Sequence, residues 1–237
     1  MASDREIDGG QNIPPPPGYT IELRLKNQLV VMIGGGKVGA RKLPDLLEAG
    51  ARVKLIDPAS LPQLPQHPCL AHVKHSYLSR DLTGARLVFA LTDDPVVNER
   101  IAADAEAAGI FCCRADSAAA SDFISPARLR RPPLTFSVSS GGECPALVAI
   151  LSRHLGDLIP TSWQTATHLA GLIRRKVLTE RLQIPYNQQV LLKLIDQGLI
   201  RLIEQSDSAA LDRLLLKHFG AGFSLQDLQF QIPEGTP

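Results

Sequence analysis

Short apolar runs alternate with amphipathic stretches over residues 21–116 of the 237-residue chain. Residues 29–33 (LVVMI) form a continuous apolar run, which is typical of a strand buried on both faces of a parallel sheet. We predict further strands at residues 21–25 (IELRL), 51–57 (ARVKLID), 85–93 (ARLVFALTD) and 110–116 (IFCCRAD). Residues 58–80, with four prolines and three of the six histidines, predict an irregular connection.

Two amphipathic stretches between these strands predict helices over residues 37–50 and 95–109. Gly50 and Gly109 suit the C-terminal caps of these helices, and Pro95 suits the first turn of the second one. Strands that alternate with helices pair in parallel, because each connection crosses over the sheet. The first half of the chain therefore predicts a Rossmann-like α/β fold with a doubly wound parallel sheet.

The hydrophobic pattern changes near Ser121. Residues 121–142 predict two extended segments joined by a basic, proline-containing turn, and Pro145 suits the first position of an amphipathic helix over 145–159. Beyond Pro160 the chain is predicted to be helical, with the short SLQDLQF as its last helical segment. The second half is therefore a different kind of unit from the first.

Composition and charge exclude several classes of protein. Hydrophobic residues make up 44% and charged residues 21% of the chain, and the formal net charge of +1 favours neither a nucleic-acid nor a membrane partner. The apolar runs are far too short to span a bilayer, and residues 1–19 lack the pattern of a secretory signal. We therefore predict a cytoplasmic protein. The four cysteines form no CxxC pair and predict reduced, mostly buried thiols.

The loop after the first buried strand is rich in glycine. Gly34, Gly36 and Gly39 give the pattern GxGxxG between a predicted strand and a predicted helix. The first glycine of this pattern permits a tight turn, the second lets the backbone approach a pyrophosphate, and the third allows a helix to pack closely on a strand. The helix N-terminus, at Lys37 and Val38, adds N–H groups and a positive dipole end.

Asp57 ends the next predicted strand, close to the offset at which a carboxylate binds the adenosine ribose of a dinucleotide. An acid at this point favours NAD over NADP, because it repels the 2′-phosphate of NADP. The competing interpretation is a glycine-rich turn without a ligand. A short-chain dehydrogenase is excluded because none of Tyr19, Tyr77 and Tyr186 is followed four residues later by lysine. A phosphate-binding P-loop is excluded because no Gly-Lys-Ser/Thr follows the glycines.

Five motifs in order resemble those of the siroheme-synthase dehydrogenase/ferrochelatase family: GGGKVGARK, LLEAGARV, LTDDPVVNERI, IFCCRADSAAASDFISPA and FSVSSGGECPALVAILSRHL. The resemblance runs from about residue 21 to residue 160 and continues as a looser helical match. It implies oxidation of precorrin-2 to sirohydrochlorin with NAD⁺, and in many members also the insertion of Fe²⁺ to make siroheme. It further implies a homodimer formed through the middle segment. Since no methyltransferase domain follows, the chain resembles the stand-alone form of the family.

The resemblance also implies roles for individual residues. Thr92 and Asp93 match the segment beside the cofactor at the end of a central strand, and the three glycines match the NAD loop. Asp116 matches the essential aspartate of the family, the proposed general base in dehydrogenation, which is also implicated in chelation. Ser140 matches a serine near the active site that is phosphorylated in some members. Independently of the family, Asp116 follows a strand at the sheet edge where ligands bind, although an aspartate before serine commonly caps a turn.

The chain departs from the family pattern at three points. Cys144 precedes Pro145 where relatives commonly have serine, which removes a good N-cap. Gly39 stands where many relatives have alanine, which the fingerprint also accepts. The segment CCRA before Asp116 replaces a more usual segment that contains asparagine, so the pose of Asp116 is open.

A tetrapyrrole substrate rich in carboxylates needs a basic surface near its site. Arg128 and Arg131, in the turn ARLRRPP, provide guanidinium groups that suit carboxylates, although a solvated charged turn is the plain alternative. The sequence has no HxxxH, HExxH or CxxC motif, and we predict no protein metal ligands. The macrocycle supplies its own nitrogen ligands, so Fe²⁺ enters only as a substrate and the sequence leaves chelation open.

We therefore predict four parts: a disordered leader (1–19), an NAD-binding Rossmann domain (20–120), a dimerisation segment (121–160) and a helical module (161–237). The sequence is also compatible with two other functions. One is a non-catalytic module that senses NAD(H) for a partner, and the other is a methyltransferase that uses a similar glycine loop for S-adenosylmethionine.

Overall fold

The computed structural model describes residues 18–184 and 186–233. It divides into two compact units, an N-terminal unit that ends at Ser125 and a C-terminal unit that begins at Pro126. Apart from Gly18 and Tyr19, the predicted leader lies outside the described residues.

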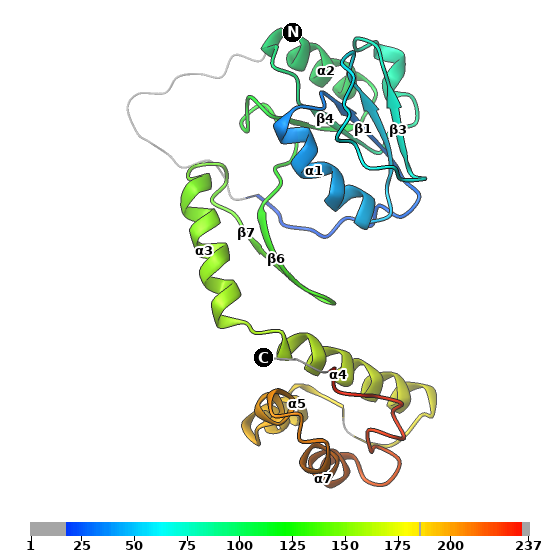
Figure 1. The fold of residues 1–237 in the computed structure, drawn as a ribbon, viewed down its shortest axis with the longest axis vertical. Coiled ribbons are helices and arrows are strands. Elements are labelled where there is room, and N and C mark those ends of the chain that lie inside the picture. Colours follow the sequence, from blue (N-terminus) through cyan, green and yellow to red (C-terminus); the bar gives the residue numbers. More distant parts are fainter. Residues whose placement is uncertain (1–17, 185, 234–237) are drawn as a thin grey trace. The chain divides into compact units, whose positions relative to one another are not determined.

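The N-terminal unit is built on a parallel five-stranded sheet in the order β3-β2-β1-β4-β5 (Figure 1). The strands are β1 (Leu29–Ile33), β2 (Arg52–Ile56), β3 (Leu70–Val73), β4 (Leu87–Ala90) and β5 (Phe111–Arg114). The apolar β1 lies in the centre, and β4 is buried along its whole length. The predicted Rossmann-like, doubly wound fold is therefore confirmed.

Helices cover both faces of this sheet, because successive side chains of each strand point to opposite faces. The helices are α1 (Lys37–Glu48), α2 (Pro95–Ala107) and the 3₁₀ turn η1 (Ser79–Leu82). One cluster of buried side chains joins α1 to the sheet through Val30, Met32, Leu43 and Leu46. A second cluster joins α2 to the opposite face through Val31, Ile33, Ile101 and Ala105 (Figure 1). Cys113 belongs to the first cluster and Cys112 to the second, because neighbouring side chains of a strand point to opposite faces.

Two predictions of secondary structure in this unit are wrong. Residues 21–25 alternate as a strand does, but they form no strand; Leu25 is buried, while Ile21 and Leu23 are 57% and 42% exposed. Residues 58–80 are not wholly irregular, because they contain β3 and the start of η1. β3 is a short, half-exposed edge strand, so it lacks the apolar run that identifies buried strands.

The C-terminal unit begins with a hairpin and a helix that packs on it. β6 (Ala127–Arg131) and β7 (Leu134–Val138) pair antiparallel, as the two predicted extended segments require. Helix α3 (Pro145–Leu158) contacts both strands, and Pro145 occupies its first turn as predicted (Figure 1).

The rest of the C-terminal unit is a helical module with its own apolar core. The helices are α4 (Ser162–Thr179), α5 (Gln188–Asp196), α6 (Leu199–Glu204) and α7 (Ser208–Phe219). Gly198, in the left-handed region at φ 95°, separates α5 from α6. The prediction of a last helix over SLQDLQF is wrong, because residues 225–229 form turns. The apolar side chains of this segment complete the core of the helical module. In the part of the chain that the structure describes, no helix is long and apolar enough to cross a bilayer.

Candidate cofactor and substrate site

The predicted cofactor and proton-acceptor residues of the N-terminal unit meet at one edge of the sheet. The parallel register aligns Ile33 of β1 with Ile56 of β2 and with Ala90 of β4, and Ala90 with Arg114 of β5. The glycine loop and Asp57 come directly after β1 and β2, and Thr92 and Asp116 lie two residues beyond the ends of β4 and β5. The carboxyl edge of a parallel sheet is where ligands of open α/β folds bind.

The three glycines of the loop meet three different surroundings. Gly34 has φ +99°, and a Cβ on it would lie 2.5 Å from the carbonyl oxygen of Leu91. A Cβ on Gly39 would lie 2.6 Å from the carbonyl oxygen of Gly34, so helix and loop touch here. Alanine at Gly39 therefore fits this backbone only after a shift. A Cβ on Gly36 would meet no atom within 4 Å. The loop thus has closed first and third positions and an open second position, as a pyrophosphate cradle requires.

The N-terminus of α1 lies at this open position. Gly36 is its N-cap residue and provides no side-chain hydrogen bond to the first turn, where Lys37 and Val38 are exposed. The first N–H groups of a helix have no partner within the helix and carry its positive dipole end. These residues therefore fit the pyrophosphate of a dinucleotide.

Asp57 faces the glycine loop from the end of β2. One oxygen of its carboxylate accepts the Gly35 N–H at 2.6 Å, and the other accepts the Ala59 N–H at 2.8 Å. The carboxylate is thereby held beside the loop by two backbone donors. This placement agrees with the role predicted for Asp57 toward a ribose.

The segment after β4 is organised by Asn98, which sequence reasoning missed. Its side chain is fully buried on α2, and its amide nitrogen donates to the Thr92 carbonyl at 3.0 Å and to Asp116 Oδ1 at 3.1 Å. Its amide oxygen accepts from the N–H and the hydroxyl of Thr92. Asp93 is exposed beside this network, and Asp94 caps α2. Asn98 thus ties the predicted cofactor segment to the predicted base.

Asp116 is held by a cation as well as by Asn98. The guanidinium of Arg114 donates to both carboxylate oxygens, at 3.2 Å from Nε and 2.7 Å from Nη2. The hydrogen bonds from Arg114 hold the pKa of Asp116 below its usual value, against the opposite effect of partial burial. The side chains of Arg114 and Asp116 are 12% and 24% exposed. The carboxylate is therefore ionised, partly accessible and paired.

The predicted substrate residues lie in the C-terminal unit and have local partners there. The Ser140 hydroxyl accepts the Cys144 N–H at 2.9 Å and so supports the start of α3. The guanidinium of Arg131 donates to the carbonyls of Gly156 and Ile159 at the end of α3. Arg128 lies on β6 and has an exposed side chain. The structure thus brings Ser140 and Arg131 to the two ends of α3.

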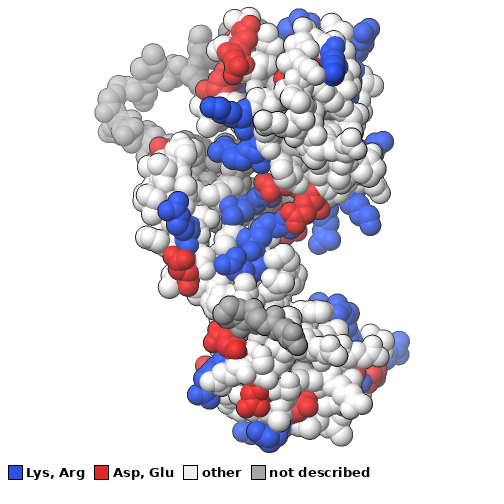
Figure 2. All heavy atoms as spheres, viewed as in Figure 1, with Lys and Arg blue, Asp and Glu red and all other residues white. Residues whose placement is uncertain are grey.

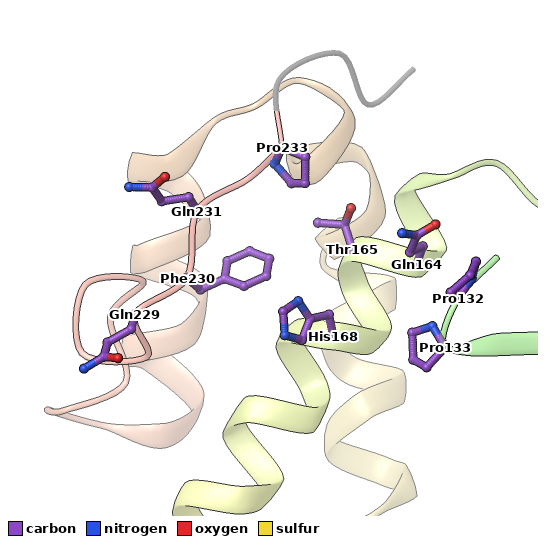
Figure 3. A pocket seen from close by; sticks show the side chains of 9 residues that line it. All are labelled: Pro132, Pro133, Gln164, Thr165, His168, Gln229, Phe230, Gln231 and Pro233. Carbon is purple, nitrogen blue, oxygen red and sulfur yellow. The ribbon is translucent and has the colours of Figure 1, made fainter. Parts of the chain in front are cut away.

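The C-terminal unit also contains a cavity that begins beside the predicted substrate residue Arg131, at Pro132 and Pro133. The cavity has a volume of about 200 Å³ and is lined by prolines, glutamines, Thr165, His168 and Phe230, and the rings of His168 and Phe230 pack edge to face beside it (Figure 3). Figure 2 shows both signs of charge on each unit, with neither unit covered by one sign. The described residues include no group of three or more His, Cys, Asp or Glu side chains placed to hold a metal ion.

Comparison with known proteins agrees with this site. Residues 21–127 match the family described as "Putative NAD(P)-binding", which confirms the predicted nicotinamide-dinucleotide domain. A siroheme synthase of Chromobacterium violaceum is 33% identical over 86% of this chain and 44% of its own length. A siroheme synthase of Citrobacter koseri is 36% identical over 65% of this chain and 34% of its own length. The chain thus spans less than half the length of the curated relatives that it matches.

Among solved structures, "SirC, precorrin-2 dehydrogenase" superposes with a TM-score of 0.63 at 22% identity, over 78% of this chain and 92% of that chain. That likeness supports the fold observed in this chain. The sequence matches extend over the glycine loop, the network of Asn98 and Asp116, and part of the C-terminal unit. The chain is therefore similar to siroheme synthases over 86% of its length, and its first unit contains the dinucleotide-binding domain.

Proposed function

We propose that this chain oxidises precorrin-2 to sirohydrochlorin with NAD⁺ as the hydride acceptor. The observation that carries the proposal is the shared sheet edge, where Asn98 joins the cofactor segment at Thr92 to the carboxylate of Asp116. The names of the matched relatives, siroheme synthases and a precorrin-2 dehydrogenase, support the same reaction.

Each residue at the edge has a distinct part in this proposal. The glycine loop, from Gly34 to Gly39, and the first turn of α1 hold the pyrophosphate, and Asp57 holds the adenosine ribose. Asp93 and Thr92 line the cofactor site after β4. NAD⁺, when bound, supplies the acceptor for a hydride from the substrate. Asp116 accepts the proton that leaves the neighbouring atom of the substrate.

The reaction is tested by giving purified protein precorrin-2 and NAD⁺ under anaerobic conditions and following the absorption of sirohydrochlorin and NADH. We expect turnover by the wild-type chain and a loss of about a hundredfold or more in Asp116→Asn, because general-base catalysis contributes that order. The matched control is Asp196→Asn, which neutralises an exposed carboxylate on α5. A wild-type chain that forms no sirohydrochlorin contradicts the proposal.

The same preparation separates the competing functions. A chain that binds NADH tightly but gives no turnover supports a sensing module, for which Asp116→Ala leaves the biological output intact. Binding of S-adenosylmethionine without NAD binding supports a methyltransferase. Addition of Fe²⁺ tests whether the chain also inserts iron, since a chelatase consumes sirohydrochlorin faster than the control without protein.

The proposal includes a homodimer formed through residues 121–160. The side chains of Leu147, Ile150, Leu151 and Leu158 follow helical spacing on α3 and are 45–74% exposed. An exposed apolar stripe on a helix suits a self-complementary interface between two copies.

Light scattering tests the dimer. Leu151→Glu should give a monomer, while Leu178→Glu, at a 62% exposed leucine of α4, should leave the dimer intact. A monomeric wild-type chain would contradict this part of the proposal. The tetrapyrrole substrate and the cytoplasmic location remain predictions of the proposed pathway.

A further inference from the structure

The carboxylate proposed to accept a proton is already paired in this structure. Arg114 donates to both oxygens of Asp116, in the two-pronged geometry that guanidinium groups form with carboxylates. A base is most effective when its pKa lies near the working pH, and this pairing lowers the pKa of Asp116. The observed arrangement therefore holds Asp116 in its less basic state.

The side chains of Asp116 and Arg114 are held by different partners. Asp116 is also held by the buried amide of Asn98 on α2, so its position does not depend on Arg114 alone. The Arg114 guanidinium donates to Asp116, and Glu99 on α2 is a second acid whose charge acts on Arg114. Loss of the Arg114 contact thus leaves Asp116 in place but makes it more basic.

The guanidinium lies at the edge where the proposed substrate binds. Arg114 is the last residue of β5, and its side chain is 12% exposed. The proposed substrate is a polycarboxylate, and its acetate and propionate groups offer the same two oxygens as Asp116. A substrate carboxylate can therefore compete with Asp116 for Arg114.

We propose that Arg114 is the receptor for one carboxylate of the tetrapyrrole, and that binding replaces the Arg114–Asp116 pair by an Arg114–substrate pair. The exchange releases Asp116 as a proton acceptor only when substrate is present. Arg114 is thus a substrate-binding residue that also controls its neighbour. This inference rests on the proposed function, because it takes the substrate class from it.

The decisive test is a double-mutant cycle on binding of sirohydrochlorin in the absence of NAD⁺, measured by its absorption at neutral pH. Arg114→Gln should weaken binding about tenfold, since one charge-assisted bidentate contact is lost. Asp116→Asn should strengthen binding several-fold, because it removes the competitor for Arg114. In the Arg114→Gln background the second change should have little effect. Arg80→Gln, an exposed arginine of η1, is the matched control.

The pH profile gives an independent readout on turnover. In the wild-type chain the acid limb of kcat/KM, which reports the free enzyme, should lie at lower pH than the acid limb of kcat, which reports the complex. In Arg114→Gln the two limbs should approach each other, because the free-enzyme pKa of Asp116 rises.

The outcomes separate the two proposals. If the two substitutions have additive effects on sirohydrochlorin binding, or if Arg114→Gln leaves binding and the kcat/KM limb unchanged, the exchange is overturned. A wild-type chain that shows the binding cycle but no oxidation contradicts the proposed reaction instead, and leaves Arg114 as a tetrapyrrole-carboxylate receptor.

Discussion

The carboxylate of Asp57 accepts the backbone N–H of Gly35 at 2.6 Å, so the end of β2 is bonded directly to the glycine loop. The same carboxylate is the group proposed to bind the ribose. We therefore propose two roles for this carboxylate, one in the shape of the loop and one in recognition of the cofactor.

Substitutions at Asp57 should separate these roles. Asp57→Asn keeps an oxygen that can accept from Gly35, so we expect an intact loop and NADH binding weakened by about tenfold or less. Asp57→Ala loses both functions and should weaken binding further. Fluorescence titration with NADH measures the affinity of each variant for the cofactor. Thermal unfolding measures whether the fold around the loop stays intact. Equal NADH affinity in wild type and Asp57→Ala would show that the carboxylate does not face the cofactor.

Gly36 and Gly39 predict opposite responses to alanine. Gly36→Ala adds a methyl group into open space at φ −64°, so the free energy of unfolding should stay within about 0.5 kcal/mol of wild type while NADH binding falls. Gly39→Ala places a methyl group against the Gly34 carbonyl and should cost about 1–3 kcal/mol of stability.

Urea unfolding and NADH titration of both glycine variants measure the two effects. A destabilised Gly36→Ala chain with normal NADH affinity would contradict the cradle. A fully stable Gly39→Ala chain would show instead that the loop shifts easily.

The ion pair between the buried Asp81 and the partly exposed Lys54 predicts a dependence of stability on pH. Asp81 is 3% exposed and its carboxylate lies 2.8 Å from the Lys54 ammonium. Burial alone would raise the pKa of Asp81, but hydrogen bonds from Lys54 and the Leu78 N–H outweigh it and lower the pKa. Because the folded-state pKa lies below the unfolded value of about 3.9, the pair stabilises the fold above that pH. This contribution is lost as the pH falls through the folded-state pKa.

Asp81→Asn should therefore cost about 1–3 kcal/mol at pH 7, since it removes a charge-assisted hydrogen bond. Its stability should fall less steeply than that of wild type when the pH is lowered through and below about 4. Urea unfolding followed by a probe in the N-terminal unit measures both quantities. Parallel pH curves for the two proteins would assign the acid sensitivity to other groups.

The cysteines should differ in reactivity according to burial. Burial raises the pKa of the Cys112 thiol to about 12, and it also raises that of Cys113. Cys144 is exposed and Cys69 is half-buried. At mildly alkaline pH a thiol reagent should therefore modify Cys144 fastest and leave Cys112 and Cys113 unmodified until urea unfolds the chain. Mass spectrometry of the modified peptides measures this order, with Cys144→Ser as the control.

The sheet edge could be predicted from sequence because its parts are local signals. The run LVVMI fixes a buried central strand, and the glycines that follow it need a tight turn. In a parallel sheet the ends of all strands meet at the same edge, so Asp57 and Asp116 were expected near the loop.

The contacts at that edge could not be predicted, because they depend on tertiary packing. Asn98 is a polar residue in a predicted helix, and nothing in its neighbours along the chain shows that it is fully buried. Arg114 and Asp116 are two residues apart, yet their pairing depends on the turn of the chain after β5. For the same reason residues 21–25 were misassigned, since alternation alone does not supply a neighbouring strand.

The side-chain amide of Asn98 on α2 donates both to Thr92 after β4 and to Asp116 after β5, so the positions of these two segments depend on each other. Grafting only one of these two segments from a relative would separate it from the α2 helix that positions it through Asn98. The unit of exchange in this site is therefore the whole stretch from Thr92 to Asp116, with Asn98 as its fixed reference point.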